Sequence, residues 1–182
     1  IKEYEKHVNT QAAEAFKQRY LEAFSDKPYK DYALAYWIHS SVGAKLHIEI
    51  LEALGAKVIR VGERGEGFIA LDTEDMTKDH LKFLREVVGN IKNDPKYHAE
   101  ILPDRQVEIT VDGEKRIFLG VHSSDGDSDR PVVVDEKGKF WRGDVLGAVF
   151  ARFMGLKHFI QPLTGSADVP DYLKKYGIEF IS

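Results

Sequence analysis

The fold is decided by residues 32–61, YALAYWIHSSVGAKLHIEILEALGAKVIRV. The first part is a nearly continuous apolar run, rich in Tyr and Trp and too short for most helices, which predicts a buried strand. In the middle, Leu46, Ile50 and Leu54 recur with helical spacing. Gly55 then stands where a left-handed helix cap is favoured, and AKVIRV predicts a second strand. A β-α-β unit implies a parallel pair with a right-handed crossover, and hence an α/β layered domain.

The flanking segments add helices and antiparallel strands to this unit. The first 25 residues have an apolar stripe at every fourth position and predict an amphipathic helix, as do residues 81–91. QVEITVDGEKRIFLGV predicts a hairpin that turns at Asp112–Gly113. PVVVD and FW predict further strands, and a helix is expected from about Asp144 to Met154. We therefore predict a mixed β-sheet flanked by helices.

The C-terminal segments HFIQPL, DVPDYLKKY and IEFIS predict one more strand, helix and strand. They resemble the beginning of a new β-α-β unit with no remaining chain to complete its sheet. The sequence thus predicts a main domain over residues 1–156 and an incomplete unit over residues 157–182. Because position 1 is Ile, we also expect the chain to be a piece of a longer protein.

Composition excludes several classes of protein. The 182 residues, 43% of them hydrophobic, suffice for one core, and no apolar run approaches the ~18 residues of a membrane span. A net charge of -4 lacks the basic field on which nucleic-acid binding depends. The absence of cysteine excludes disulfides, thiol catalysis and cysteine-ligated metals, and fits a cytoplasmic protein.

Three carboxylates at alternating positions are the main candidate for chemistry: Asp125, Asp127 and Asp129 in DGDSDR. Carboxylates gathered in one loop repel one another unless a cation compensates. Oxygen ligands without cysteine or clustered histidine favour a hard ion, Mg²⁺ first and Ca²⁺ second. The segment must curl to bring the three groups to one ion, and Gly126 is expected to permit the curl.

Two other interpretations of this loop compete with a Mg²⁺ site. A solvated acidic turn between strands needs no ion. An EF-hand loop would place ligands at Asp125, Asp127, Asp129 and Glu136. It is disfavoured because Arg130 stands where that loop needs Gly, and because a strand rather than a helix precedes it.

DGDSDRPVVVDEKGKFWRGD resembles the metal-binding loop and following hairpin of the α-D-phosphohexomutase superfamily, the phosphoglucomutases and phosphomannomutases. IHSSVGAKLHIEILEALGAKVI resembles the strand, helix and strand of that family's second domain, and the C-terminal β-α-β start resembles the opening of its third. The resemblance is close over about residues 32–61 and 119–155. It implies that residues 1–156 form a layered domain like the family's second domain.

The resemblance also implies roles for individual residues. Asp125, Asp127 and Asp129 would hold Mg²⁺, and Arg130 would contact the phosphate of the catalytic phosphoserine. Together the ion and the guanidinium would neutralise a phosphoryl group that moves between the serine and a hexose hydroxyl. Such enzymes interconvert hexose 1-phosphate and hexose 6-phosphate through a bisphosphorylated sugar.

The family's Ser-His-Asn-Pro type motif does not occur in this chain, and residues 93–115 are extra relative to the family. The resemblance therefore implies that the chain alone is inactive, and that its partners are the missing domains of the same protein and their hexose phosphate. The alternative from another class is a non-catalytic α/β binding module with an Asp-rich loop for Ca²⁺ or Mg²⁺.

Polar residues at two strand ends are expected to stabilise the fold rather than to bind a ligand or act in catalysis. After His39, a hydroxyl of Ser40 or Ser41 is expected to cap the following helix rather than to build an anion site. In His122-Ser123-Ser124, adjacent residues of a strand point to opposite faces, which disfavours a nucleophile with its base and favours loop-capping hydroxyls.

Three further groups of residues are also expected to have structural rather than functional roles. Trp37, Phe140 and Trp141 are expected to pack in the core or at a domain interface rather than to stack on a sugar. In the tripeptide Arg142-Gly143-Asp144, the aspartate is expected to cap the next helix. The charges of the glycine-rich loop are expected to be solvated: Glu63, Arg64 and Glu66.

Overall fold

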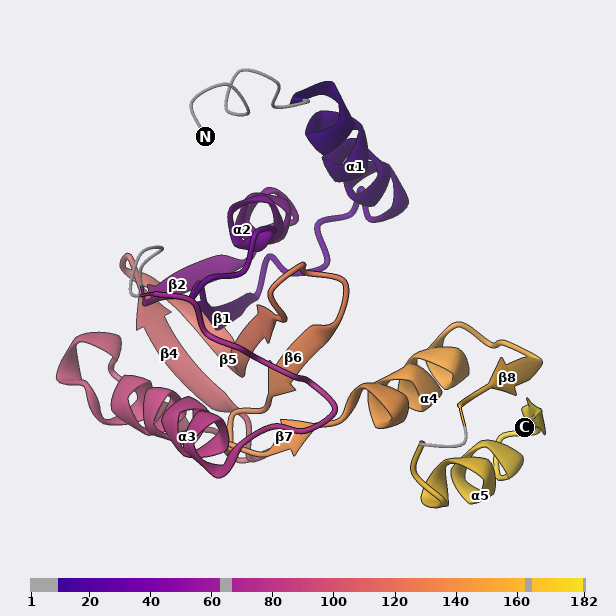
Figure 1. The fold of residues 1–182 in the computed structure, drawn as a ribbon. Coiled ribbons are helices and arrows are strands. Elements are labelled where there is room, and N and C mark those ends of the chain that lie inside the picture. Colours follow the sequence, from indigo (N-terminus) through magenta and orange to yellow (C-terminus); the bar gives the residue numbers. More distant parts are fainter. Residues whose placement is uncertain (1–9, 63–66, 163–164, 182) are drawn as a thin grey trace.

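A computed structural model describes residues 10–62, 67–162 and 165–181 of the chain. Its main body is built on a mixed sheet of seven strands, in which β2, β1, β5, β4 and β3 lie side by side and β6 and β7 continue from β5 (Figure 1). The α/β fold class with a mixed sheet is thus confirmed. The strands are β1 (Tyr32–Trp37), β2 (Lys57–Val61), β3 (Glu100–Ile101), β4 (Val107–Val111), β5 (Glu114–Ser124), β6 (Pro131–Val134) and β7 (Phe140–Trp141).

Strand β1 lies between β2 and β5 and is parallel to both. Helix α2 (Ala44–Ala53) connects β1 to β2, so the β-α-β unit predicted from residues 32–61 is present. Side chains of β1 alternate between the two faces. Leu34 and Tyr36 pack in the cluster under α2, whereas Ala33 and Ala35 pack in the larger cluster on the other face.

Helix α3 (Lys78–Asn93) covers that second face, opposite α2 (Figure 1). Its predicted apolar stripe is buried as expected, with Leu84, Val88 and Ile91 in the core against Phe118 of β5. Two layers of helix therefore enclose the sheet, because each face of a fully buried parallel strand needs an apolar cover.

The predicted hairpin is also confirmed. Asp112 and Gly113 separate β4 from β5 with φ angles of 52° and 78°, the two positive values that a two-residue type I′ turn requires. The extra segment of residues 93–115 supplies the short helix η2 (Pro95–Tyr97), β3 and β4, all at the edge of the sheet beyond β5.

Strand β5 contains an irregularity at Gly120. Ala33 of β1 pairs with Phe118, but Ala35 pairs with Val121, so β5 has one residue more than β1 over this interval. Gly120 has a φ of 105°, and a Cβ on it would lie 2.1 Å from the carbonyl oxygen of Val134 in β6. Only glycine fits a β-bulge of this kind, where the neighbouring backbone passes directly over the Cα atom.

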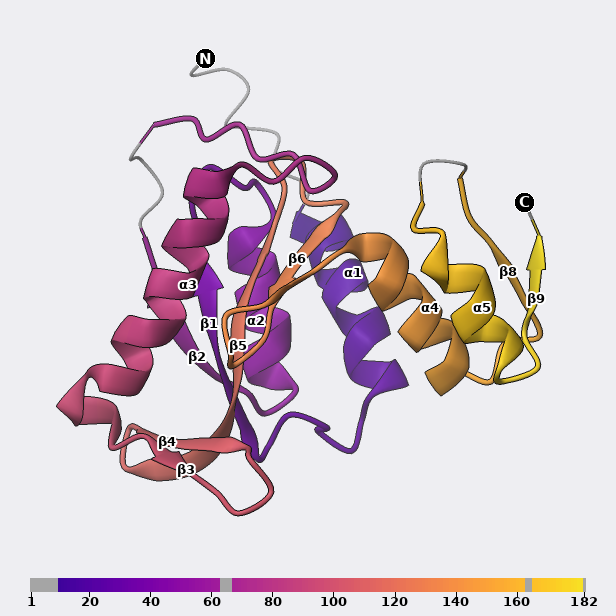
Figure 2. The same cartoon turned by 90° about the horizontal axis from the view of Figure 1, so that it is seen from below.

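The last part of the chain forms a second lobe beside the sheet, visible in both views (Figures 1 and 2). It consists of α4 (Gly143–Phe153), β8 (His158–Ile160), α5 (Asp168–Lys174) and β9 (Glu179–Ile181), with β8 and β9 parallel. Ala148 and Ala151 of α4 are buried against Val169 and Leu173 of α5. Helix α4 thus shares its core with α5 and the C-terminal strands, whereas the predicted boundary at residue 156 lies after this helix.

Helix α1 (Thr10–Ala23) confirms the described part of the N-terminal prediction and lies against α2 on the outside of the main body (Figure 1). None of its side chains is fully buried. Within the described residues, no helix is both long enough and apolar enough to cross a membrane.

Candidate metal centre

The aspartate loop, residues 125–130, leaves the end of β5 and returns as β6. The backbone N–H of Asp125 donates to the carbonyl of Arg130 (3.1 Å), and that of Ser128 donates to the carbonyl of Asp125 (3.2 Å). The curl that the alternating carboxylates require is therefore present. Its left-handed residue is Ser128, with φ 72°, whereas Gly126 has no positive φ.

The curl brings the three carboxylates together. Asp125, Asp127 and Asp129 each offer an oxygen within 4.8 Å of the others, and this is the only such group of three found among the described residues. Asp125 is buried, with 1% of its surface exposed, while Asp127 and Asp129 are exposed. One anchored carboxylate with two at the solvent edge suits a cation that exchanges with water and phosphate oxygens.

Arg130 fixes the buried carboxylate. Its Nε donates to Oδ2 of Asp125 over 2.6 Å and its backbone N–H donates to Oδ1 over 3.2 Å. Burial raises the pKa of Asp125, but these hydrogen bonds outweigh it, so the net pKa lies below the ordinary value. The group is therefore a carboxylate at neutral pH, the form in which it can ligate a metal.

The outer carboxylate experiences the opposite effect. Desolvation, followed by the charges of Asp127 and Asp125, raises the pKa of Asp129. Like charges at this distance disfavour one another's ionised form, and a bound divalent cation would reverse the effect. The donor set thus fits a hard cation by its chemistry as well as by its spacing.

The arginine makes one further contact that no local sequence pattern indicates. Asp72, from the segment before α3, lies 3.5 Å from an Nη atom of Arg130. The side chain of Arg130 remains 45% exposed, so part of the guanidinium is available to a ligand. Asp72 is 58 residues away in the chain, which is why no local pattern could reveal it.

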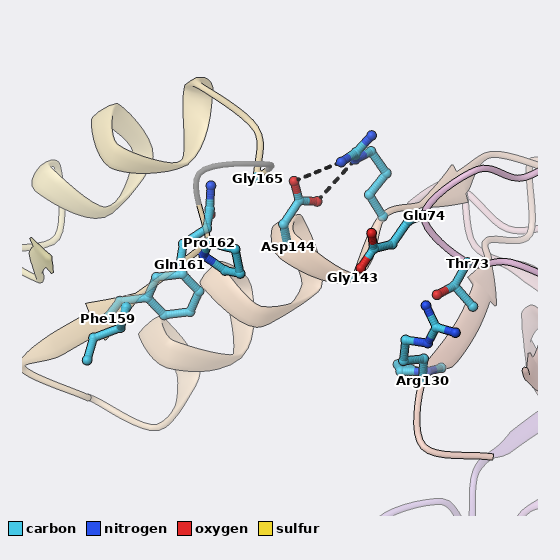
Figure 3. A pocket seen from close by; sticks show the side chains of 12 residues that line it. Thr73, Glu74, Arg130, Gly143, Asp144, Phe159, Gln161, Pro162 and Gly165 are labelled. Carbon is cyan, nitrogen blue, oxygen red and sulfur yellow. Dashed lines mark hydrogen bonds and ion pairs between the residues drawn. The ribbon is translucent and has the colours of Figure 1, made fainter. Parts of the chain in front are cut away.

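Arg130 also borders a cleft of about 230 Å³ between the main body and the second lobe. Figure 3 shows Arg130 and Thr73 on one side, and Asp144 and Gln161 on the other. Oε1 of Gln161 is buried and has no hydrogen-bond partner among the described residues. The other lining residues are Glu74, Pro131, Arg142, Gly143, Phe159, Ile160, Pro162 and Gly165.

The predicted helix cap is wrong. The N-cap of α2 is Gly43, and no side chain of its own segment caps it. Ser40 instead bonds the backbone of Ile69, and Ser41 bonds serines of β5 and of the aspartate loop. The N–H of Gly43 donates to Oγ of Ser128 over 2.7 Å, so a hydroxyl from the loop replaces the expected local cap.

The hydroxyls of residues 122–124 have structural contacts, as expected. Ser123 donates to the carbonyl of Trp37, and Ser124 bonds Ser41. Trp37 is buried in the core. Phe140 packs against the same core, and Trp141 donates from Nε1 to Asp135.

Asp144 lies inside the first turn of α4 rather than at its cap, which is Arg142. Its carboxylate accepts hydrogen bonds from the backbone N–H groups of Val145 and Ser166, and thereby joins the helix to the loop after β8. Of the glycine-loop charges, Glu63, Arg64 and Glu66 lie outside the described residues.

Gly43→Ala should destabilise the protein. An added Cβ would lie 2.7 Å from Cβ of Ser128, closer than side chains approach, so the aspartate loop would have to shift. We expect a loss of about 1–3 kcal/mol in the free energy of unfolding, measured in urea. Gly126→Ala is the control, because a Cβ there meets no atom within 4 Å. Equal stability of the two variants would contradict the close approach.

Acid should weaken the fold through His122, which is half-buried at the edge of a cavity of about 880 Å³. Burial lowers its pKa to about 4. Because an unfolded histidine has a pKa of ~6.5, the folded protein binds fewer protons, and stability present above about pH 6.5 is lost as the pH falls towards 4. We expect this to cost about 2 kcal/mol in urea unfolding.

His122→Gln should remove that part of the acid sensitivity, whereas replacement of the exposed His98 by Gln should leave it intact. If the two variants lost stability in parallel with the unmodified chain, His122 would not be the group responsible.

Comparison with known proteins reveals relatives of one kind. The chain is 29% identical over 161 residues to a phosphomannomutase of Sinorhizobium fredii, and 30% identical over 140 residues to a phosphomannomutase of Salmonella muenchen. It is 26% identical over 146 residues to a phosphoglucosamine/phosphogalactosamine mutase of Sulfurisphaera tokodaii. These alignments cover 88%, 77% and 77% of the chain, respectively. No family model matches it.

The chain spans only 28%, 24% and 27% of the length of these relatives. All three relatives carry the names of mutases of phosphorylated hexoses, and each alignment covers at least 77% of the chain. By homology the chain belongs to the phosphohexomutase superfamily.

Proposed function

We propose that the chain is the Mg²⁺-binding part of a phosphohexomutase, which interconverts hexose 1-phosphate and hexose 6-phosphate through a phosphoserine and a bisphosphorylated sugar. The observation that carries the proposal is the carboxylate cluster at the end of β5, with Arg130 bonded to its buried member. On this proposal the main body corresponds to the family's second domain. The lobe from α4 to β9 corresponds to the start of its third.

The residues fit the ion. Asp125, Asp127 and Asp129 would hold Mg²⁺, which prefers carboxylate oxygens and retains water or phosphate oxygens in its remaining positions. When bound, the ion would supply charge neutralisation for a phosphoryl group in transfer. Arg130 keeps Asp125 ionised through its Nε atom, while its exposed Nη donors would bind the phosphate.

The cleft beside Arg130 is where we propose that the sugar phosphate approaches. Arg130 and Arg142 both line it, and Oε1 of Gln161, which has no hydrogen-bond partner among the described residues, is an acceptor suited to a sugar hydroxyl. Both the main body and the second lobe contribute to this cleft, which supports a substrate that bridges them.

The chain alone is proposed to be inactive, because the phosphorylatable serine motif of the family does not occur in it. The test is conversion of hexose 1-phosphates by the chain alone and by a longer polypeptide that joins it to a domain with that motif. The chain alone should show no turnover, and the longer protein should show turnover that Asp127→Asn removes. Metal binding without turnover in the longer protein would instead favour the non-catalytic binding module.

A further inference from the structure

The aspartate loop rests against the junction between β1 and α2. The N–H of Val42 donates to the carbonyl of Gly126 over 3.0 Å, and the N–H of Gly43 donates to Oγ of Ser128 over 2.7 Å. These donors belong to the turn that leads into α2, whose N-cap residue Gly43 makes no side-chain cap. Gly126 and Ser128 are therefore attached to the segment that begins α2, whereas Asp127 between them is exposed to solvent.

A chain of hydroxyls continues this attachment to the end of β5. Oγ of Ser41 lies 2.7 Å from Oγ of Ser128 and 2.7 Å from Oγ of Ser124. Ser41 and Ser124 are buried, with 1% and 2% of their surface exposed. Since Ser128 accepts from Gly43, it can donate to Ser41, which can in turn donate to Ser124. Each hydroxyl thereby has a partner, and two of the three are buried away from water.

His39 also contacts the end of β5, at the backbone of Ser124. Its Nε2 lies 2.8 Å from the carbonyl oxygen of Ser124, and because a carbonyl only accepts, Nε2 carries the proton. The ring is buried, with its centroid 4.7 Å from that of Trp37. The carbonyl of Ser124 belongs to the peptide bond that enters Asp125, so this contact orients the residue that anchors the carboxylate cluster.

We propose that Ser41 and His39 are positioning residues for the cation, which touch neither the ion nor the substrate but hold the loop in its ligating shape. This inference rests on the metal site of the proposed function. Three unneutralised carboxylates repel one another, so a free loop would spread them apart. The contacts of Ser41 and His39 form when the protein folds and keep the carboxylates together before the ion binds. Residues that orient the ligands of a metal in this way raise the affinity of the site for the metal.

The experiment measures the dissociation constant of Mn²⁺, as a paramagnetic substitute for Mg²⁺, by electron paramagnetic resonance on the 182-residue chain. Ser41→Ala should weaken Mn²⁺ binding on the order of tenfold or more. Ser124→Ala breaks the same chain at its other end and should have a similar effect. In the double variant the second substitution should add little, because the chain is already broken.

Ser123→Ala is the matched control. Ser123 is the neighbour of Ser124, is buried to 5% exposure and donates to the carbonyl of Trp37, which is not part of the loop. It should lower the melting temperature about as much as Ser41→Ala does, yet leave Mn²⁺ affinity within about twofold. If Ser41 had a purely structural role, the melting temperature and the Mn²⁺ affinity would fall together in Ser41→Ala, Ser124→Ala and Ser123→Ala.

The outcomes separate the two proposals. If the unmodified chain binds no Mn²⁺, the metal site of the proposed function and the positioning role both fail. If it binds Mn²⁺ and loses it in Asp127→Asn, but Ser41→Ala and Ser124→Ala bind as the unmodified chain does, only the positioning role is overturned. Equal weakening by Ser123→Ala would overturn it as well.

Discussion

Asp127→Asn should strongly weaken divalent-cation binding without unfolding the protein. The side chain is exposed and makes no hydrogen bond or ion pair among the described contacts, so its role in the fold is small. It is nevertheless one of three carboxylates whose oxygens lie within 4.8 Å of one another. Removal of one charge from such a set should reduce Mn²⁺ affinity on the order of 100-fold.

The measurement is paramagnetic broadening in the NMR spectrum of the labelled chain as Mn²⁺ is added. Broadening should centre on residues 125–130 in the unmodified chain and disappear in the variant. The control is Asp75→Asn, which removes the same charge from another exposed aspartate. Broadening that is uniform along the chain, or that survives in Asp127→Asn, would show that the loop is a solvated turn.

Gly120→Ala should cause the largest loss of stability in the main body. The new Cβ would lie 2.1 Å from the carbonyl oxygen of Val134 and 2.5 Å from the carbonyl carbon of Asp135, and backbone atoms inside a sheet cannot move aside cheaply. The φ of 105° adds strain for any residue with a side chain. Together these effects should cost about 4 kcal/mol or more in urea unfolding.

Gly89→Ala is the matched substitution in the same body. Gly89 lies within α3, and a Cβ there meets nothing within 4 Å. The change should stabilise the chain by about 0.5–1 kcal/mol, because alanine loses less backbone entropy in a helix. A Gly120→Ala variant as stable as the unmodified chain would mean that β5 has no bulge at this position.

The elements that could be predicted are those in which local pattern and long-range packing agree. The apolar run of β1, the spacing of Leu46 and Ile50 in α2 and the turn at Asp112–Gly113 each contain their own structural information within a few residues. The aspartate loop was found because its carboxylates are adjacent in the chain. The curl that unites them was expected on the same ground.

What could not be predicted depends on contacts between distant residues. Gly120 lies in a strand that looks regular, and only the pairing with Ala33 and Ala35 of β1 reveals the bulge. The hydroxyl of Ser128 replaces a helix cap 85 residues away, so Ser40 and Ser41 looked like the better candidates. Likewise, the apolar face of α4 indicates that another element packs against this helix. It does not indicate that this element is α5 rather than the main sheet.

The bulge also limits how the length of this region can change. Side chains alternate along a strand, so the number of residues between Gly120 and the aspartate loop decides which of them face α3 and which face α2. At present Ser123 reaches the carbonyl of Trp37, and His122 faces the opposite side, next to Tyr36. A single insertion or deletion here would exchange these positions, whereas the hairpin turn after β4 meets open space and should accommodate insertions. Length differences among related chains should therefore accumulate at that turn, and the four residues before Asp125 should keep their number.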